Sequence, residues 1–139
     1  MKKIDRAQEW FKRAKSNMAL VRAGKVSPDI LYEDLCFEAQ QATEKALKAL
    51  CITHKIIFPK THNIEYLMEL LEKEKVFIPE EVQAARLLTD YAVATRYPGG
   101  YEPVSKQDYE KASKIAEVVL SWVEENSGKT KSRTKRKKV

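Results

Sequence analysis

The chain has few of the residues that metal, disulfide or phosphate-loop chemistry requires. Its 139 residues include two histidines, two cysteines and four glycines. There is no Cys-x-x-Cys, no His-Glu-x-x-His and no glycine-rich phosphate loop of either common spacing. His54 and His62 stand eight residues apart across a predicted loop, which is weak support for a metal site. We therefore expect no metal and no other cofactor.

The positions of the cysteines and the lengths of the hydrophobic runs indicate in which cellular compartment the protein is expected. Cys36 and Cys51 fall in one predicted helix, about 22 Å apart at 1.5 Å per residue, whereas a disulfide needs Cα atoms within about 7 Å. Both are predicted to be small core residues in a reducing compartment. The chain shows no run of about 18 apolar residues and no export-type start. We expect a soluble, cytoplasmic protein that does not associate with membranes.

The positive net charge is concentrated at one end of the chain. Residues 129–139 hold seven of the 26 Lys and Arg residues and no acid, so the rest carries 19 basic and 20 acidic side chains. We predict a domain over residues 1–128 and a disordered basic tail over 129–139. The tail has two interpretations: an arm that binds RNA through its phosphates, or a solubilising terminus.

Apolar residues recur at helical spacing, without sustained alternation of period two, so the sequence predicts an all-α bundle of five helices with up-and-down topology. Gly24 is the expected stop of the first helix, Ser27-Pro28 the start of the second and Thr61 the cap of the third. Ser105 and Asp108 form a capping box for the fifth. The expected helices span about residues 5–23, 27–54, 63–73, 79–96 and 105–126.

The second predicted helix carries a stripe of mostly small residues, which allows close approach of a neighbouring helix. Glu44 and Lys48, four residues apart, are predicted on its outer face as a supporting pair, as are Gln41 and Lys45. The stripe consists of Leu35, Ala39, Ala42, Ala46 and Ala49.

The segment "RYPGGY" is the candidate binding site. Arg96 ends the fourth predicted helix, where a cation is favoured by the helix dipole, so a structural role is one interpretation. Two consecutive glycines exceed what a helix stop requires and favour close approach of a ligand. Tyr97 and Tyr101 are suited to stacking, and Arg96 is suited to a phosphate. His62, at the start of the third predicted helix, is a further candidate for anion contact.

The order of these motifs resembles the HEPN domain family. The motifs are Trp10, "FEAQQATEKALKAL", "THNIEYLMELL" and "LLTDYAVATRYPGGY", and the likeness covers about residues 5–125. The resemblance implies a helical bundle, commonly a homodimer, associated with nucleotide binding. Many HEPN proteins are metal-independent ribonucleases with arginine, four to six residues and then histidine. Counting from Arg96, those positions hold Tyr101, Glu102 and Pro103.

The missing histidine leads us to expect a non-catalytic protein, because an unperturbed tyrosine is a poor base at neutral pH. The "RYP" branch that the chain resembles is often encoded beside a minimal nucleotidyltransferase, as half of a toxin–antitoxin-like pair. The resemblance thus implies a nucleotide-binding partner of that enzyme. The alternatives are a metal-independent ribonuclease, using Arg96 with Tyr101 or His62, and a purely structural subunit.

Overall fold

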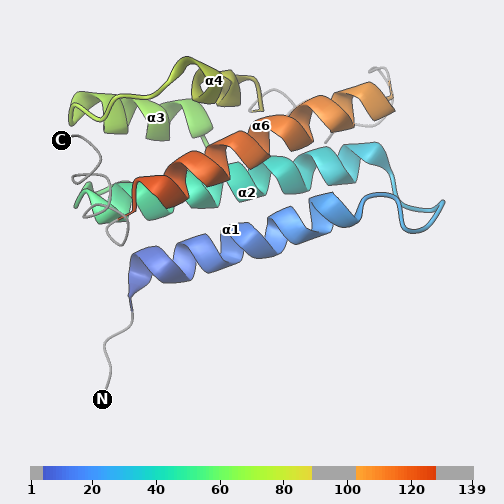
Figure 1. The fold of residues 1–139 in the computed structure, drawn as a ribbon, viewed down its shortest axis with the longest axis horizontal. Helices are drawn as coiled ribbons and strands as arrows, with labels where there is room; N and C mark the ends of the chain where they lie inside the picture. Colours follow the sequence, from blue (N-terminus) through green and yellow to red (C-terminus); the bar gives the residue numbers. More distant parts are fainter. Residues whose placement is uncertain (1–4, 89–102, 128–139) are drawn as a thin grey trace.

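The computed structural model describes residues 5–88 and 103–127, and these residues form helices and loops without any strand. Figure 1 shows α1 running opposite to α2 and α6. The predicted all-α class is confirmed. The elements in chain order are α1 (Arg6–Ala23), α2 (Tyr32–Thr53), α3 (Ile64–Lys73), α4 (Glu80–Gln83), the 3-10 turn η1 (Ala84–Leu87) and α6 (Lys106–Glu125).

Helix α1 begins and ends where the sequence predicts. The Asp5 carboxylate accepts a hydrogen bond from the Gln8 backbone N–H at 3.1 Å and caps the start. Gly24 ends the helix with φ at 69°, a conformation that glycine adopts without strain. A Cβ on Gly24 would also lie 3.3 Å from the Tyr109 hydroxyl of α6. The backbone conformation therefore favours glycine here, and any side chain would also require the Tyr109 hydroxyl to shift.

The predicted start of the second helix and the predicted cap of the third are wrong, and in both cases a side chain forms a local turn instead. Ser27 Oγ accepts from the Asp29 N–H at 3.2 Å, and the Ser27 carbonyl accepts from the Ile30 N–H, so Pro28 lies in a turn before α2. Thr61 Oγ1 similarly accepts from the Asn63 N–H. Asn63 itself caps α3 by accepting from the Tyr66 N–H at 3.0 Å.

Helix α2 is the centre of the bundle and contacts α1, α3 and α6. Figure 1 shows it between α1 on one side and α3 with α4 on the other. Its predicted stripe of small residues is buried throughout, which permits this close packing on several sides. Cys36 and Cys51 are free thiols of the same core, as predicted, and burial raises the pKa of each to about 12.

The remaining helices agree with the sequence where the structure describes them. Ser105 and Asp108 form the predicted capping box at the start of α6. The helix predicted over 79–96 begins as α4 and continues as η1, with Val82, Ala85 and Leu88 buried. Its later part, including Ala92, and the predicted tail over 129–139 lie outside the described residues. Within the described parts, no helix is both long and apolar enough to cross a membrane.

Candidate functional site

After the end of α2 the chain turns back along this helix, which brings His62 next to an α2 side chain. Lys55 adopts φ of 59°, and the Ile56 N–H donates to the Cys51 carbonyl at 2.9 Å, which closes a Schellman-type turn. The chain then leads back to His62, just before α3. Its Nδ1 lies 3.0 Å from Glu44 Oε2 in α2. The His62 side chain is 81% exposed, whereas that of Glu44 is 2% exposed.

Beneath His62 lies a buried ion pair that the sequence interpretation misplaced. Lys48 Nζ donates to Glu44 Oε2 at 2.9 Å, and the Lys48 side chain is 7% exposed. The prediction that these two residues occupy the outer face of the helix is therefore wrong. Spacing four residues apart suits both a surface pair and a buried one, and the packing of three helices around α2 decides between them.

Aromatic rings complete the surroundings of the Lys48 ammonium. Its Nζ lies 5.0 Å from the centre of the Trp10 ring in α1 and 5.9 Å from the Phe58 ring. A cation over a ring face is attracted by the ring quadrupole, and the attraction is stronger where water is excluded. The lysine is thus held by one carboxylate and two rings from separate parts of the chain.

Two buried oxygens of this region keep unused acceptor capacity. Glu44 Oε1 and Gln40 Oε1 have no hydrogen-bond partner among the residues that the structure describes. The two residues are four apart in α2, so they share one face of the helix. Buried polar atoms are normally satisfied, so these two oxygens are exceptions within the described part of the chain. We define the buried polar cluster as Gln40, Glu44 and Lys48.

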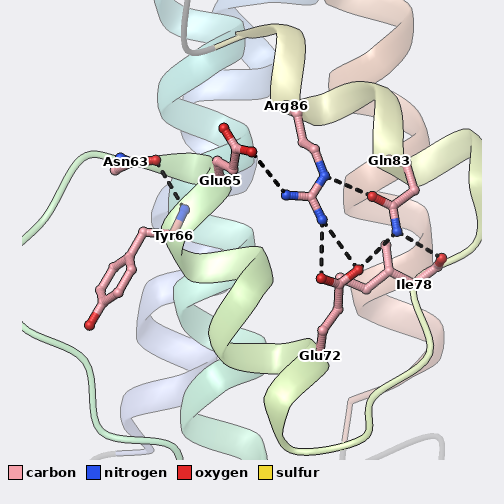
Figure 2. Close-up of polar contacts among 7 residues, drawn as sticks. All are labelled: Asn63, Glu65, Tyr66, Glu72, Ile78, Gln83 and Arg86. Atoms are coloured by element: carbon pink, nitrogen blue, oxygen red, sulfur yellow. Dashed lines mark hydrogen bonds and ion pairs between the residues drawn. The ribbon is translucent and has the colours of Figure 1, made fainter.

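A second polar cluster, on the surface, joins η1 to α3 (Figure 2). Arg86 Nε donates to Gln83 Oε1 at 2.8 Å, and Arg86 Nη2 lies 3.2 Å from both oxygens of Glu72. Arg86 Nη1 lies 3.5 Å from Glu65. The hydrogen bond from Gln83, with the charge of Arg86, holds the pKa of Glu72 below its ordinary value. We call Arg86, Gln83, Glu65 and Glu72 the Arg86 clamp.

The structure places one of the four predicted site residues. His62 is exposed at the start of α3, as the sequence suggested. Arg96, Tyr97 and Tyr101 lie in 89–102, outside the described residues. Sequence analysis did not find the roles of Glu44, Lys48 and Arg86. A usable signal for the first two was the density of apolar and small residues around them in α2, which indicates a helix enclosed on several sides.

In the described part of the chain, no three His, Cys, Asp or Glu side chains gather as a metal-binding group. The side chains around His62 are instead suited to proton exchange and hydrogen bonding. An imidazole whose Nδ1 faces a buried carboxylate has its other nitrogen, Nε2, on the opposite ring edge. That nitrogen accepts or donates a hydrogen bond according to the protonation state of the ring.

Comparisons with known proteins agree with this helical arrangement. The crystal structure of TT1696 from Thermus thermophilus superposes with a TM-score of 0.71 and 32% identity, covering 88% of this chain and 98% of that one. The crystal structure of ST0689, an archaeal HEPN homologue, superposes with a TM-score of 0.68 and 28% identity, covering 89% and 97%.

Among curated sequences, the Methanocaldococcus jannaschii protein named "Putative toxin MJ1304" is 27% identical over an alignment of 136 residues, and the match covers 88% of this chain and 88% of that one. The family model for the HEPN domain matches residues 5–126, nearly the whole folded part. The resemblance seen in the sequence motifs is thereby confirmed, and the chain belongs to the HEPN family.

Proposed function

We propose that this HEPN chain is one component of a toxin–antitoxin-like pair and binds a nucleotide or RNA phosphate without cleaving it. The carrying observation is His62, an exposed imidazole held at Nδ1 by a buried carboxylate. The name of the Methanocaldococcus jannaschii relative, "Putative toxin MJ1304", supports the biological setting. Under this proposal the partner is a minimal nucleotidyltransferase, the chain is a cytoplasmic homodimer, and the binding module spans 1–128.

The proposed ligand contacts divide by chemistry. Arg96 supplies a forked, permanently charged donor for phosphate, and His62 supplies a second donor through Nε2 when protonated. Tyr97 and Tyr101 stack on a base. The absence of histidine at 101, 102 and 103 argues for binding rather than cleavage. A basic tail at 129–139 adds salt-sensitive RNA attraction.

Calorimetric titration with nucleotides tests the proposal. A charge-assisted hydrogen bond contributes about 1.5 to 3 kcal/mol, so Arg96→Ala is expected to weaken binding about tenfold or more. His62→Ala is expected to weaken it in the same direction. Arg13→Ala, which removes an exposed arginine of α1 paired with Glu9, is the matched control and should bind as the original chain does. Dissociation constants of Arg96→Ala and His62→Ala that equal those of the control and of the original chain would reject the proposed site.

A metal-independent ribonuclease is the second candidate, and one observation favours it. A carboxylate that holds the Nδ1 side of a histidine is the arrangement that orients a general base, and His62 with Glu44 has it. The test is incubation of structured RNA with purified protein in the presence of a chelator. Cleavage that disappears in both Arg96→Ala and His62→Ala would replace the binding proposal with this one.

The remaining parts of the proposal have separate tests. Co-expression with the product of the adjacent gene, followed by affinity purification, should recover a stable complex if that product is a nucleotidyltransferase. Sedimentation analysis should give the mass of a dimer. Removal of residues 129–139 should abolish RNA retention that high salt also abolishes. Retention that survives the deletion would assign RNA binding to the folded part alone.

A further inference from the structure

We propose that Glu44, held by Lys48, is a positioning residue that fixes the tautomer and orientation of His62. This inference rests on the proposed function only for what His62 then contacts, namely a phosphate or ribose hydroxyl. The positioning itself follows from the geometry of the buried polar cluster.

The tautomer follows from counting donors and acceptors at one oxygen. Glu44 Oε2 lies 2.9 Å from Lys48 Nζ and 3.0 Å from His62 Nδ1. An ammonium only donates, and a carboxylate paired with it only accepts. The nitrogen of His62 that faces this oxygen must therefore carry the proton. The structure thus assigns Nδ1–H to the His62 ring and leaves Nε2 as the group that meets a ligand.

Burial makes this arrangement effective. Glu44 and Lys48 are almost fully enclosed, so their charges are weakly screened, and Trp10 and Phe58 restrict the ammonium on two sides. His62 is attached to that fixed pair through a single nitrogen and is otherwise exposed. A neutral His62 then offers the Nε2 lone pair to a hydroxyl proton, and a protonated His62 offers Nε2–H to a phosphate oxygen.

The alternative is that the buried pair serves stability alone. In that case Glu44 does not influence the imidazole of His62. An exposed histidine ring without a partner takes the tautomer that water favours, which carries the proton on Nε2. The two roles therefore differ in an observable that does not depend on any ligand. The unused Glu44 Oε1 shows that the carboxylate also keeps acceptor capacity beyond Lys48 and His62 among the described residues.

The experiment is nitrogen-15 NMR of the histidine rings in the full-length protein, at a pH where the rings are neutral. The chain has two histidines, so His54→Gln assigns the signals. The key variant is Glu44→Leu with Lys48→Met, which removes both charges together and keeps volume and helix propensity. Glu9→Gln with Arg13→Met, at an exposed pair four residues apart, is the matched control. Glu44→Gln is a second, isosteric variant in case the double variant does not fold.

We expect Nδ1–H for His62 in the original chain and in the control, and a change towards Nε2–H in the double variant. Glu44→Gln should change in the same direction by less. An identical His62 tautomer in the original chain and in whichever of the two Glu44 variants folds would overturn the positioning role.

Titration with AMP separates this inference from the proposed function. If AMP binds the original chain, the double variant should bind it more weakly by up to about tenfold, less than the loss of a whole charge-assisted hydrogen bond, because the His62 ring loses its orientation but is still present. An unchanged affinity beside a changed tautomer would overturn the link to binding. If AMP does not bind the original chain but the tautomer changes, the positioning role is supported and nucleotide binding through AMP is rejected.

Discussion

The buried polar cluster and the Arg86 clamp join the same kinds of charge at similar distances but in different surroundings. The Lys48–Glu44 contact is 2.9 Å and almost fully enclosed by helices. The Arg86–Glu72 contacts are 3.2 Å, with Glu72 41% exposed. In the first, removing one partner strands a charge away from water. In the second, water solvates the charged side chain that remains when its partner is removed. Burial, and not distance, therefore decides what each pair contributes.

The two clusters also serve different neighbours. The buried pair holds a single exposed side chain, His62, at the start of α3. The Arg86 clamp contacts both ends of α3, because Glu65 lies in its first turn and Glu72 precedes its last residue. The segment just before α3 is thus linked to α2 through His62 and the buried Glu44, and α3 itself is linked to η1 through surface contacts. The following predictions test how far these two attachments differ in strength.

The largest effect is expected from Lys48→Met. The substitution leaves Glu44 buried without its cation, which costs about 3–5 kcal/mol of the free energy of unfolding. Urea unfolding followed by circular dichroism measures it. Lys111→Met, at an exposed position of α6, is the control and should change stability by less than about 0.5 kcal/mol. Similar losses for both variants would mean that the Lys48 environment is not special.

Arg86→Ala is expected to cost about 1 kcal/mol, because its contacts are several but partly exposed. The loss should shrink as salt is added, since mobile ions screen the original clamp. The same urea measurement at low and high salt checks this. A loss as large as that of Lys48→Met, independent of salt, would erase the difference between the two clusters.

A smaller, pH-dependent effect is expected at the exposed pair of Arg22 and Glu117, which meet at 2.6 Å. The hydrogen bond from Arg22, with its charge, lowers the pKa of Glu117 below 4.5 in the folded state. The pair therefore stabilises the fold above the unfolded pKa, and this contribution is lost as the pH falls through the folded pKa. Exposure limits it to about 0.5 kcal/mol.

The measurement for this pair is urea unfolding of Glu117→Gln at about pH 7 and about pH 3. We expect the variant to be less stable than the original chain at the higher pH, and this deficit should become smaller at the lower pH, where the Glu117 carboxylate is protonated more often. A deficit that persists unchanged in acid would show that the carboxylate charge is not its source.

The smallest net change is expected for the paired substitution Glu44→Leu with Lys48→Met. Because both buried charges are removed together, no charge is left buried without a partner, and no loss of stability is expected. Combined with the single variants Lys48→Met and Glu44→Leu, it gives the coupling energy of the pair. A double variant as unstable as Lys48→Met alone would show that the loss comes from packing and not from charge.

The ends of helices were predicted correctly where one or two neighbouring residues determine the backbone conformation. Gly24 and the Ser105–Asp108 box were identified correctly, because a left-handed cap and a reciprocal cap depend on residues close in sequence. Ser27 and Thr61 were misread as helix caps. Each can cap a helix or form a local turn, and the nearby residues do not distinguish these outcomes.

The candidate site was harder to predict than the fold. His62 was predicted as a site residue from its place before a helix, and the Glu44 carboxylate that it contacts lies 18 residues earlier in the chain. Nothing local to either residue indicates their contact. The helical periodicity also led to the prediction that Glu44 and Lys48 are exposed to solvent, since charged residues four apart usually stabilise an exposed helix face. The packing of three helices around α2 reversed that assignment.

By itself, the sequence determined the helical class, the burial of both cysteines and the family motifs, because these depend on the spacing of apolar residues and on local backbone preferences. Tertiary structure decided which charges are enclosed and which side chain they hold. A helix has several faces, and its own sequence cannot specify how many of them its neighbours will cover. That is the reason why a carboxylate read as a surface group lies under His62 instead.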